Sequence, residues 1–184
     1  MSLMEKTGTP VGSYAPDFEL PGVDDNVHHL SRYLEQSKGV GVIFLCNHCF
    51  YVTSYLDRLR QIQAQFQNRG FTLIGINAND PQQSPEDSFQ NMKKFAHRSQ
   101  LNFPYLWDST QDVAHSFGAQ KISEAFLIDH MGILRYSGQI DDNVEEPEAV
   151  QVPYLRNAIA ALLTGEDISP KWTEPIGSPL KWRN

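Results

Sequence analysis

The chain holds two cysteines, three positions apart in the motif Cys46-Asn47-His48-Cys49. Two thiols at this spacing can form a reversible disulfide, and a thiolate at one of them can attack a disulfide of another molecule. We predict that Cys46 attacks and that Cys49 resolves the resulting mixed disulfide. His48 stands between them, so it can stabilise the reduced pair as a cation or a hydrogen-bond donor. The expected pKa of Cys46 is therefore below that of a free thiol.

The segments around the motif predict where it stands in the fold. Residues 40–45 form a β-branched and aromatic run that is typical of a buried central strand. After the cysteines, apolar residues recur at helical spacing up to the stop signal Gly70; they are Val52, Tyr55, Leu56, Leu59, Ile62 and Phe66. The motif then lies at a strand-to-helix turn, with Cys46 in an exposed loop and Cys49 in or beside the first helical turn. Free amides and the helix dipole favour a thiolate at such a place.

The chain beyond the motif predicts alternating strands and helices. A second buried strand spans residues 71–76, and Ser84, with Pro85 and Asp87 after it, is a helix start signal. The core face of that helix consists of Phe89, Met92, Phe95 and Ala96. A short strand over residues 103–107 follows.

The C-terminal half predicts a hairpin and a last helix. A brief helix capped by Asp108 or Ser109 carries Val113, Ala114 and Phe117 and ends at Gly118. Two strands at residues 125–129 and 133–138 are joined by a link too short for a parallel crossover, so they are antiparallel. An amphipathic helix then precedes Gly165, with apolar residues Val152, Leu155, Ile159, Leu162 and Leu163.

One βαβ half followed by a ββα half is the thioredoxin arrangement, an α/β fold with a central mixed sheet flanked by helices. A flavodoxin-like sheet also fits the alternation, but the hairpin and the position of the cysteines favour the thioredoxin fold. We divide the chain into a leader at residues 1–10, a domain with an N-terminal extension at residues 11–165, and a Pro-containing tail at residues 166–184. The repeated Met at position 4 suggests that residues 1–3 are an expression leader.

Composition narrows the classes of partner. Lys and Arg number 15 against 22 Asp and Glu, a net charge of −7, so nucleic acid is an unsuitable partner. The longest apolar stretch, residues 40–46, is about a third of the roughly 20 residues of a membrane-spanning helix, so no membrane association is expected. Because the N-terminus has no apolar signal core, we expect a cytoplasmic location.

Two other interpretations of the motif remain. Cys46 and Cys49 could be small buried thiols without chemistry. With His48 they could also bind a metal, but tetrahedral zinc needs a fourth ligand, and the sequence has no second CxxC and no HxxxH. We therefore expect no metal site and no cofactor.

Several segments resemble thioredoxin-like proteins of the alkyl hydroperoxide reductase/thiol-specific antioxidant (redoxin) superfamily: residues 15–23, 42–52, 77–80, 85–89 and 138–142. The resemblance extends over residues 11–182. It is closest to a bacterial group with the motif Cys-Asn-His-Cys-Pro-Tyr-Val and a C-terminus near Gly-Cys-Ser-Ile-Lys-Trp. It implies a thiol–disulfide oxidoreductase whose partners are protein or small-molecule thiols and disulfides and an unidentified reductant.

The chain departs from that group at three places. Phe50 replaces the Pro after the second Cys, Ser178 replaces the tail Cys, and Ser123 stands where a cis-Pro is expected. A non-Pro cis bond costs about 3–4 kcal/mol, so we expect the Ile122–Ser123 bond to be trans. The resemblance implies that Asn47, Phe50, Ile122 and Ser123 bind substrate. We also expect Ser123→Pro to restore the turn, to speed disulfide reduction and to weaken metal retention.

Two alternative functions remain. One is a peroxiredoxin-like antioxidant peroxidase, for which the resemblance calls for Thr or Ser three residues before the reactive cysteine. Ile43 precedes Cys46 by three, and Cys46 itself precedes Cys49 by three, so neither thiol has that hydroxyl. The other is a non-catalytic thioredoxin-like module that binds a partner through the altered loop.

Overall fold

The computed structural model describes residues 8–184. Of the predicted leader at residues 1–10, only the last three residues are described, and the expression leader at residues 1–3 lies outside the described part.

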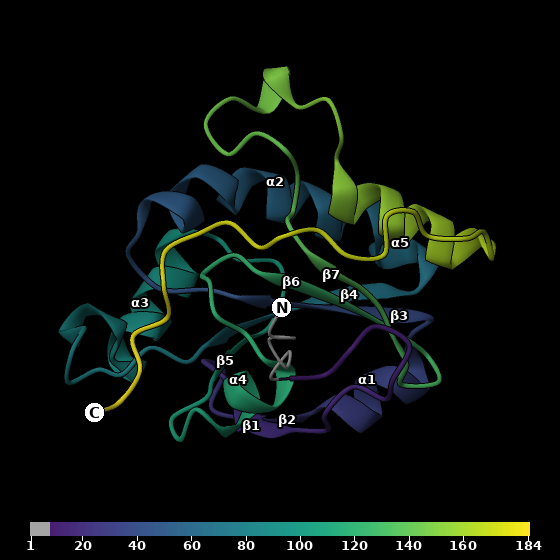
Figure 1. Cartoon of the computed structure of the whole chain (residues 1–184). Coiled ribbons are helices and arrows are strands. Elements are labelled where there is room, and N and C mark those ends of the chain that lie inside the picture. The colour runs from purple at the N-terminus through teal and green to yellow at the C-terminus, as the bar shows by residue number, and fades with distance from the viewer. Residues whose placement is uncertain (1–7) are drawn as a thin grey trace, which may run out of the picture.

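A five-stranded mixed sheet forms the centre of the molecule, in the order β5-β4-β3-β6-β7 (Figure 1). The middle strand β3 (Gly39–Phe44) pairs in parallel with β4 (Phe71–Asn77) and antiparallel with β6 (Ala125–Asp129). The edges are β5 (Tyr105–Trp107), parallel to β4, and β7 (Leu134–Gly138), antiparallel to β6. All six residues of β3 are buried, which explains why this segment is apolar throughout.

Helices cover both faces of the sheet. They are α1 (Leu30–Gln36), α2 (Phe50–Phe66), α3 (Phe89–Arg98), α4 (Asp112–Phe117) and α5 (Tyr154–Thr164), with 3₁₀ turns η1 (Gln67–Arg69), η2 (Pro85–Asp87) and η3 (Pro147–Ala149). Figure 1 shows α2 and α5 on one face and α1 and α4 on the other. This arrangement confirms the predicted α/β thioredoxin fold with its C-terminal hairpin. None of the helices in the described range is long and apolar enough to span a bilayer.

The N-terminal extension contains elements that the sequence did not indicate. A small antiparallel hairpin, β1 (Glu19–Pro21) and β2 (Val27–His29), leads directly into α1. Each strand has three residues, and in the hairpin only Leu20 is buried. Such short elements show too little apolar periodicity to be recognised.

The predicted start of the third helix is wrong by one turn. Residues 85–87 form the 3₁₀ turn η2, and α3 begins at Phe89 with Ser88 as its cap, whose side chain accepts the N–H of Asn91. The Ser84 hydroxyl instead donates to the Asp87 carboxylate at 2.7 Å. The side chains of both residues therefore turn away from capping α3 and toward the interior.

The C-terminal tail runs across the sheet end that carries the cysteines. Its Ser178 carbonyl accepts the N–H of Ile122 at 2.7 Å, and Pro179 forms a bridge with Lys121. The Lys181 N–H donates to the Asn79 side chain at 2.9 Å. The tail therefore joins the loop before β6 to the end of β4.

Candidate active site

The cysteine motif follows β3 and leads into α2. Cys49 is the N-cap residue of α2, with φ −160° and ψ 159°, so the predicted place of Cys49 beside the first helical turn is confirmed. The neighbours of β3 are a parallel strand on one side and an antiparallel strand on the other. The carboxyl end of such a strand, where the connection changes direction, is where α/β sheets commonly place their reactive groups.

The exposure of the two cysteines differs from the expectation. Both are free thiols, but Cys46 is only 2% exposed while Cys49 is half-buried. The expectation of an exposed Cys46 is wrong because the next residue, Asn47, turns inward and is hydrogen-bonded to η2 and to Tyr105 of β5.

The pKa values of the two thiols are shifted in opposite directions by this geometry. The pKa of Cys46 is raised, first by its hydrogen bond to the Cys49 sulfur and then by burial, instead of lowered as the sequence suggested. The pKa of Cys49 is lowered, mainly by the same hydrogen bond, in which Cys49 is the acceptor. The amides of Tyr51 and Val52 also favour the Cys49 thiolate, although they do not close a full capping hydrogen bond. The hydrogen bond between the two sulfurs therefore disfavours ionisation of Cys46 and favours ionisation of Cys49.

His48 influences Cys46 through its backbone. Its amide N–H lowers the pKa of Cys46, whereas its side chain is exposed and has no hydrogen bond or ion pair within residues 8–184. The predicted hydrogen bond from the His48 imidazole to the Cys46 sulfur is therefore not formed within the described residues.

Asp87 is the buried acid next to the cysteine loop. It is 1% exposed, and its carboxylate accepts the backbone N–H of Asn47 at 2.7 Å. It also accepts from the side chains of Asn77 at 3.1 Å, Asn79 at 3.0 Å and Ser84 at 2.7 Å. Four donors compensate its burial. Its negative charge raises the pKa of both cysteine thiols.

Asn47 completes this polar network. Its side chain donates to the Glu86 carbonyl at 2.9 Å and accepts the Tyr105 hydroxyl at 2.8 Å. Burial raises the pKa of Tyr105 well above its usual value, so this hydroxyl stays a donor. Asn47, which was predicted to contact substrate, is 7% exposed and faces the interior of the fold.

The other predicted substrate-binding residues lie at different depths. Phe50, at the start of α2, is 55% exposed, whereas Ile122 is 1% exposed and its N–H is taken by the tail. Ser123 is 2% exposed and lines a small pocket that also reaches Tyr51 in α2. The structure therefore places Phe50 and the Ser123 pocket near the motif at the surface.

The conformation of Ser123 excludes a proline. The Ile122–Ser123 bond is trans, as expected, since within the described range the cis bond is Ser169–Pro170. Ser123 has φ +73°, and its N–H donates to the Phe44 carbonyl at 2.6 Å. Proline cannot adopt this φ and has no N–H. The expectation that Ser123→Pro restores the turn is therefore wrong.

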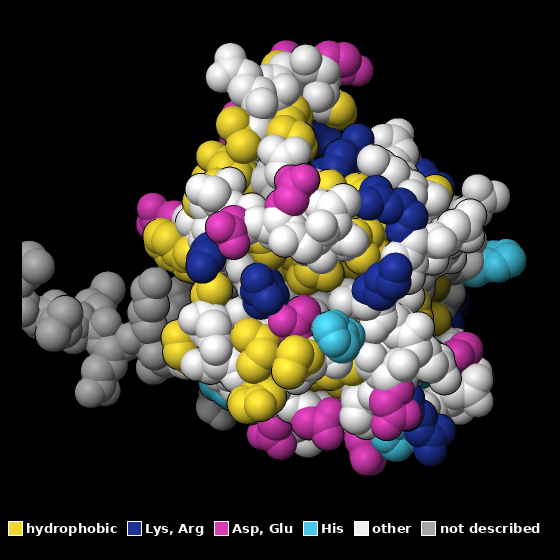
Figure 2. Space-filling model, turned by 90° about the vertical axis from the view of Figure 1, so that its right-hand side faces the viewer, with side chains coloured by type: hydrophobic (Ala, Val, Ile, Leu, Met, Phe, Trp, Pro, Cys, Tyr) yellow, Lys and Arg dark blue, Asp and Glu magenta, His cyan; other side chains and the backbone are white. Residues whose placement is uncertain are grey.

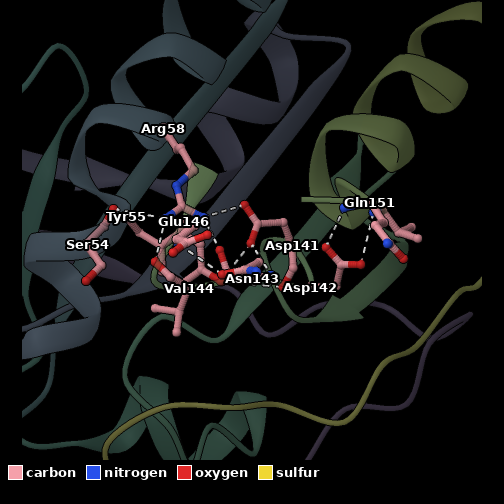
Figure 3. A network of polar contacts seen from close by, with 10 residues as sticks. Ser54, Tyr55, Arg58, Asp141, Asp142, Asn143, Val144, Glu146 and Gln151 are labelled. Carbon is pink, nitrogen blue, oxygen red and sulfur yellow. Dashed lines mark hydrogen bonds and ion pairs between the residues drawn. The ribbon is translucent and has the colours of Figure 1, made fainter. Parts of the chain in front are cut away.

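A buried ion pair supports the far side of α2. The Arg58 guanidinium donates to Asp141 at 2.8 Å and to the carbonyls of Asn143 and Val144, and the Tyr55 hydroxyl donates to Asp141 at 2.9 Å (Figure 3). Burial and, after it, the charge and hydrogen bond of the Asp141 carboxylate raise the pKa of Tyr55. This network fixes the segment after β7 to the second turn of the cysteine helix.

Within residues 8–184, no group of three His, Cys, Asp or Glu side chains is arranged to hold a metal ion.

Comparison with known proteins places the chain in a family. Residues 11–137 match the AhpC/TSA family. The chain belongs to this family. A relative named thiol-disulfide oxidoreductase ResA, from Geobacillus thermodenitrificans, is 33% identical over 131 residues, which are 70% of this chain and 68% of that protein.

Two solved structures resemble this AhpC/TSA family member over nearly its whole length. A hypothetical protein from Sinorhizobium meliloti has 30% identity and a TM-score of 0.88, with 96% of each chain covered. An uncharacterized conserved protein from Geobacillus kaustophilus has 34% identity and a TM-score of 0.87, covering 95% of this chain and 93% of its own. A putative thiol:disulfide interchange protein DsbE from Chlorobium tepidum, at 24% identity and a TM-score of 0.69, shares the fold over 85% of this chain and 99% of its own.

These relatives correct the expected cytoplasmic location of this AhpC/TSA family member. The match to thiol-disulfide oxidoreductase ResA contradicts it, because protein disulfides form and persist mainly in oxidising compartments outside the cytoplasm. The expectation rested only on the first residues of the sequence, and a location does not follow from them.

Sequence reasoning found the cysteine pair of this AhpC/TSA family member but not the residues around it. Asp87 was interpreted as a helix-start residue, and Tyr105 as part of a strand. The available signal was the row of polar residues at the end of an apolar strand, Asn77 and Asn79, at the edge of the sheet where the cysteines also lie.

Proposed function

We propose that this protein is a thiol–disulfide oxidoreductase in which Cys46 and Cys49 form the redox pair. The observation that carries the proposal is the contact between two free thiols at the N-terminus of α2, one of which is stabilised as a thiolate. Two thiols in contact can close a disulfide with little movement of the backbone. The relatives named thiol-disulfide oxidoreductase support this function.

The exchange balances as a two-electron transfer. A thiolate of the pair attacks one sulfur of a substrate disulfide, which forms a mixed disulfide and releases one substrate thiolate. The second thiol then loses its proton and attacks the mixed disulfide. This step forms the Cys46–Cys49 disulfide, releases the second substrate thiol and leaves the substrate reduced by two electrons.

The order of attack is part of the proposal. The sequence predicts that Cys46 attacks, whereas the greater exposure of Cys49 and its lowered pKa favour Cys49 as the sulfur that meets a substrate first. Cys46 would then resolve. A tuning effect of His48 on the reduced pair and contacts of Phe50, Ile122 and Ser123 with substrate also belong to the proposal.

Insulin reduction with dithiothreitol as electron donor tests this function. We expect turnover by the parent protein, none above background by Cys46→Ser and Cys49→Ser, and two new thiols when the oxidised protein is reduced. Two free thiols that persist after treatment with excess oxidised dithiothreitol or a stronger disulfide oxidant would refute the proposal. Peroxide consumption without insulin reduction would support the alternative of a peroxidase, and neither activity in a folded protein would support a binding module.

A further inference from the structure

A small pocket lies beside the cysteine motif. It has a volume of about 80 Å³, and its lining includes Tyr51 from the first turn of α2, Ser123, Val144 and Ile176. One water needs roughly 10–15 Å³, and a small-molecule site needs roughly 300 Å³ or more. This Ser123 pocket therefore fits the end of a side chain or a piece of backbone, and it is too small for a cofactor.

Ser123, which lines this pocket, carries a side-chain oxygen without a partner in the described part of the chain. Ser123 is 2% exposed, and its Oγ has no hydrogen-bond partner within the described residues. A buried hydroxyl without a partner is unfavourable, and the strained φ of +73° holds Ser123 in this position. A bound peptide group would supply the missing hydrogen bond.

The rim of the pocket continues into an acidic segment, residues 141–148. The segment contains no Lys or Arg, and its carboxylates are Asp141, Asp142, Glu145, Glu146 and Glu148. Arg58 neutralises Asp141, while the three glutamates are exposed and have no ion pair in the part of the chain that the structure describes. Figure 1 shows this part of the chain projecting beyond α2 and α5, and Figure 2 shows acidic side chains at the top of the molecule, where it projects.

The acidic segment is held in shape before anything binds. Arg58 donates to the carbonyls of Asn143 at 2.6 Å and Val144 at 2.5 Å, and the Asn143 side chain accepts the N–H of Glu146 at 2.9 Å (Figure 3). Asp142 accepts the amides of Gln151 at 2.9 Å and Val152 at 3.1 Å. A surface ordered in this way loses little conformational entropy when a partner docks.

The charges near the segment leave a net negative surface. Besides Arg58, Arg156 lies near its base, in a separate cavity that also reaches Asp141 and Pro147. The exposed carboxylates of the projecting end, Glu145, Glu146 and Glu148, form no ion pair within residues 8–184. Such a surface attracts a cationic partner and repels an anionic one.

We propose that the Ser123 pocket and the acidic segment together bind a polypeptide that carries Lys or Arg next to the disulfide exchanged by the cysteine pair. The inference rests on the proposed function and names its substrate class. The glutamates attract the cationic side chains, and the Ser123 Oγ bonds the peptide backbone close to the disulfide. An anionic small disulfide such as oxidised glutathione is a poor substrate on this basis.

Two synthetic peptides test the charge preference. Each contains one internal disulfide, and they differ only in carrying two Lys or two Glu beside it. We expect the reduced protein to exchange with the Lys peptide roughly tenfold faster at low salt, measured as a second-order rate constant after acid quenching. The ratio should fall toward one as the salt concentration rises, because salt screens surface charges.

Two charge-matched variants test whether the acidic segment causes the preference for the Lys peptide. The triple variant Glu145→Gln, Glu146→Gln and Glu148→Gln should lose most of the preference for the Lys peptide. The control variant Glu35→Gln, Glu166→Gln and Asp167→Asn removes the same charge from exposed positions elsewhere in the chain and should retain the preference. An equal loss of preference in both variants would overturn the inference, because the preference would then come from net charge alone. Equal ratios in the parent and both variants would also overturn it, because the three glutamates would then contribute nothing.

Ser123→Ala tests the pocket separately. It keeps the backbone conformation available but removes Oγ, so we expect both peptides to react roughly three- to tenfold more slowly. Unchanged rates would remove Ser123 from the binding surface. Reaction with bis(2-hydroxyethyl) disulfide, a linear disulfide that has no charge, separates the two claims. If it reacts and the peptides show no charge preference, only this inference fails; if no disulfide reacts at all, the proposed function fails and the inference with it.

Discussion

The carboxylate of Asp87 accepts the backbone N–H of Asn47 at 2.7 Å, so a residue from the turn after β4 holds the first peptide after Cys46. The same carboxylate raises the pKa of both thiols by its charge. It therefore has two opposing effects, because it orders the loop that carries the thiols and disfavours their ionisation. A pair whose thiolate is disfavoured has a less stable reduced state and is a stronger reductant.

Removing this charge should make the pair less reducing. In Asp87→Asn the thiolate is no longer opposed, so the thiol pKa values fall and the reduction potential becomes less negative, by about 30 mV for each pKa unit. Equilibration with a glutathione buffer measures the potential, and the pH dependence of alkylation should shift to lower pH. The exposed Asp112→Asn serves as the control. A potential equal to that of the parent, in a folded variant, would contradict the electrostatic role.

The two thiols should differ in reactivity when studied one at a time. Because Cys49 is half-buried and faces the amides of Tyr51 and Val52, Cys49 in the Cys46→Ser variant should react with iodoacetamide faster than Cys46 in the Cys49→Ser variant. Mass spectrometry at a series of times and pH values gives both rates. The reverse order would return the attacking role to Cys46 and show that the loop opens in solution.

Substitutions of Ser123 should change stability in opposite directions. Ser123→Pro loses the hydrogen bond to Phe44 and cannot adopt φ +73°, so we expect a loss of about 3 kcal/mol or more in the free energy of unfolding. Ser123→Gly relieves the left-handed strain and should be neutral or stabilising by up to about 1 kcal/mol. Urea denaturation measures both. A proline variant as stable as the parent would show that the loop can adopt a second conformation.

Arg58 should be essential for the segment after β7. Arg58→Met leaves the buried Asp141 without a cation, which typically costs about 3–5 kcal/mol of unfolding free energy. Adding Asp141→Asn should recover part of the loss, since no buried charge is then unpaired. The control Lys93→Met breaks a more exposed pair with Asp25 and should cost about 1 kcal/mol or less. An Arg58 variant no less stable than the Lys93 variant would refute this assignment.

The sheet and its hairpin could be predicted because their signals are local. The apolar run before Cys46, the helical spacing after Cys49 and the short link between β6 and β7 each lie within one segment of sequence. The start of a helix was less predictable where the sequence offers two possible N-cap residues, as Ser84 and Ser88 do before α3. The hairpin β1–β2 was missed because three-residue strands bury almost nothing.

The site was predictable only in part because the residues that surround the cysteines are distant from them in the sequence. The spacing of Cys46 and Cys49 indicates a redox pair, but whether a thiol is buried depends on what folds over it. Asp87 reaches the loop from forty positions away. Nothing near either cysteine in the sequence indicates that contact. The hydrogen bond from Cys46 to the Cys49 sulfur and the burial of Cys46, which raise the pKa of Cys46, are likewise not visible in the local sequence.

The tail determines when the site is completed during synthesis. Ser178 holds Ile122, and Lys181 holds Asn79, which in turn bonds Asp87. These tail residues leave the ribosome after every strand of the sheet, and at roughly 5–20 residues per second several seconds pass between the emergence of Cys49 and that of Ser178. Both cysteines are therefore exposed to the redox environment of the nascent chain before their final surroundings exist. With only two cysteines in the chain, the sole disulfide that can form within it joins Cys46 and Cys49.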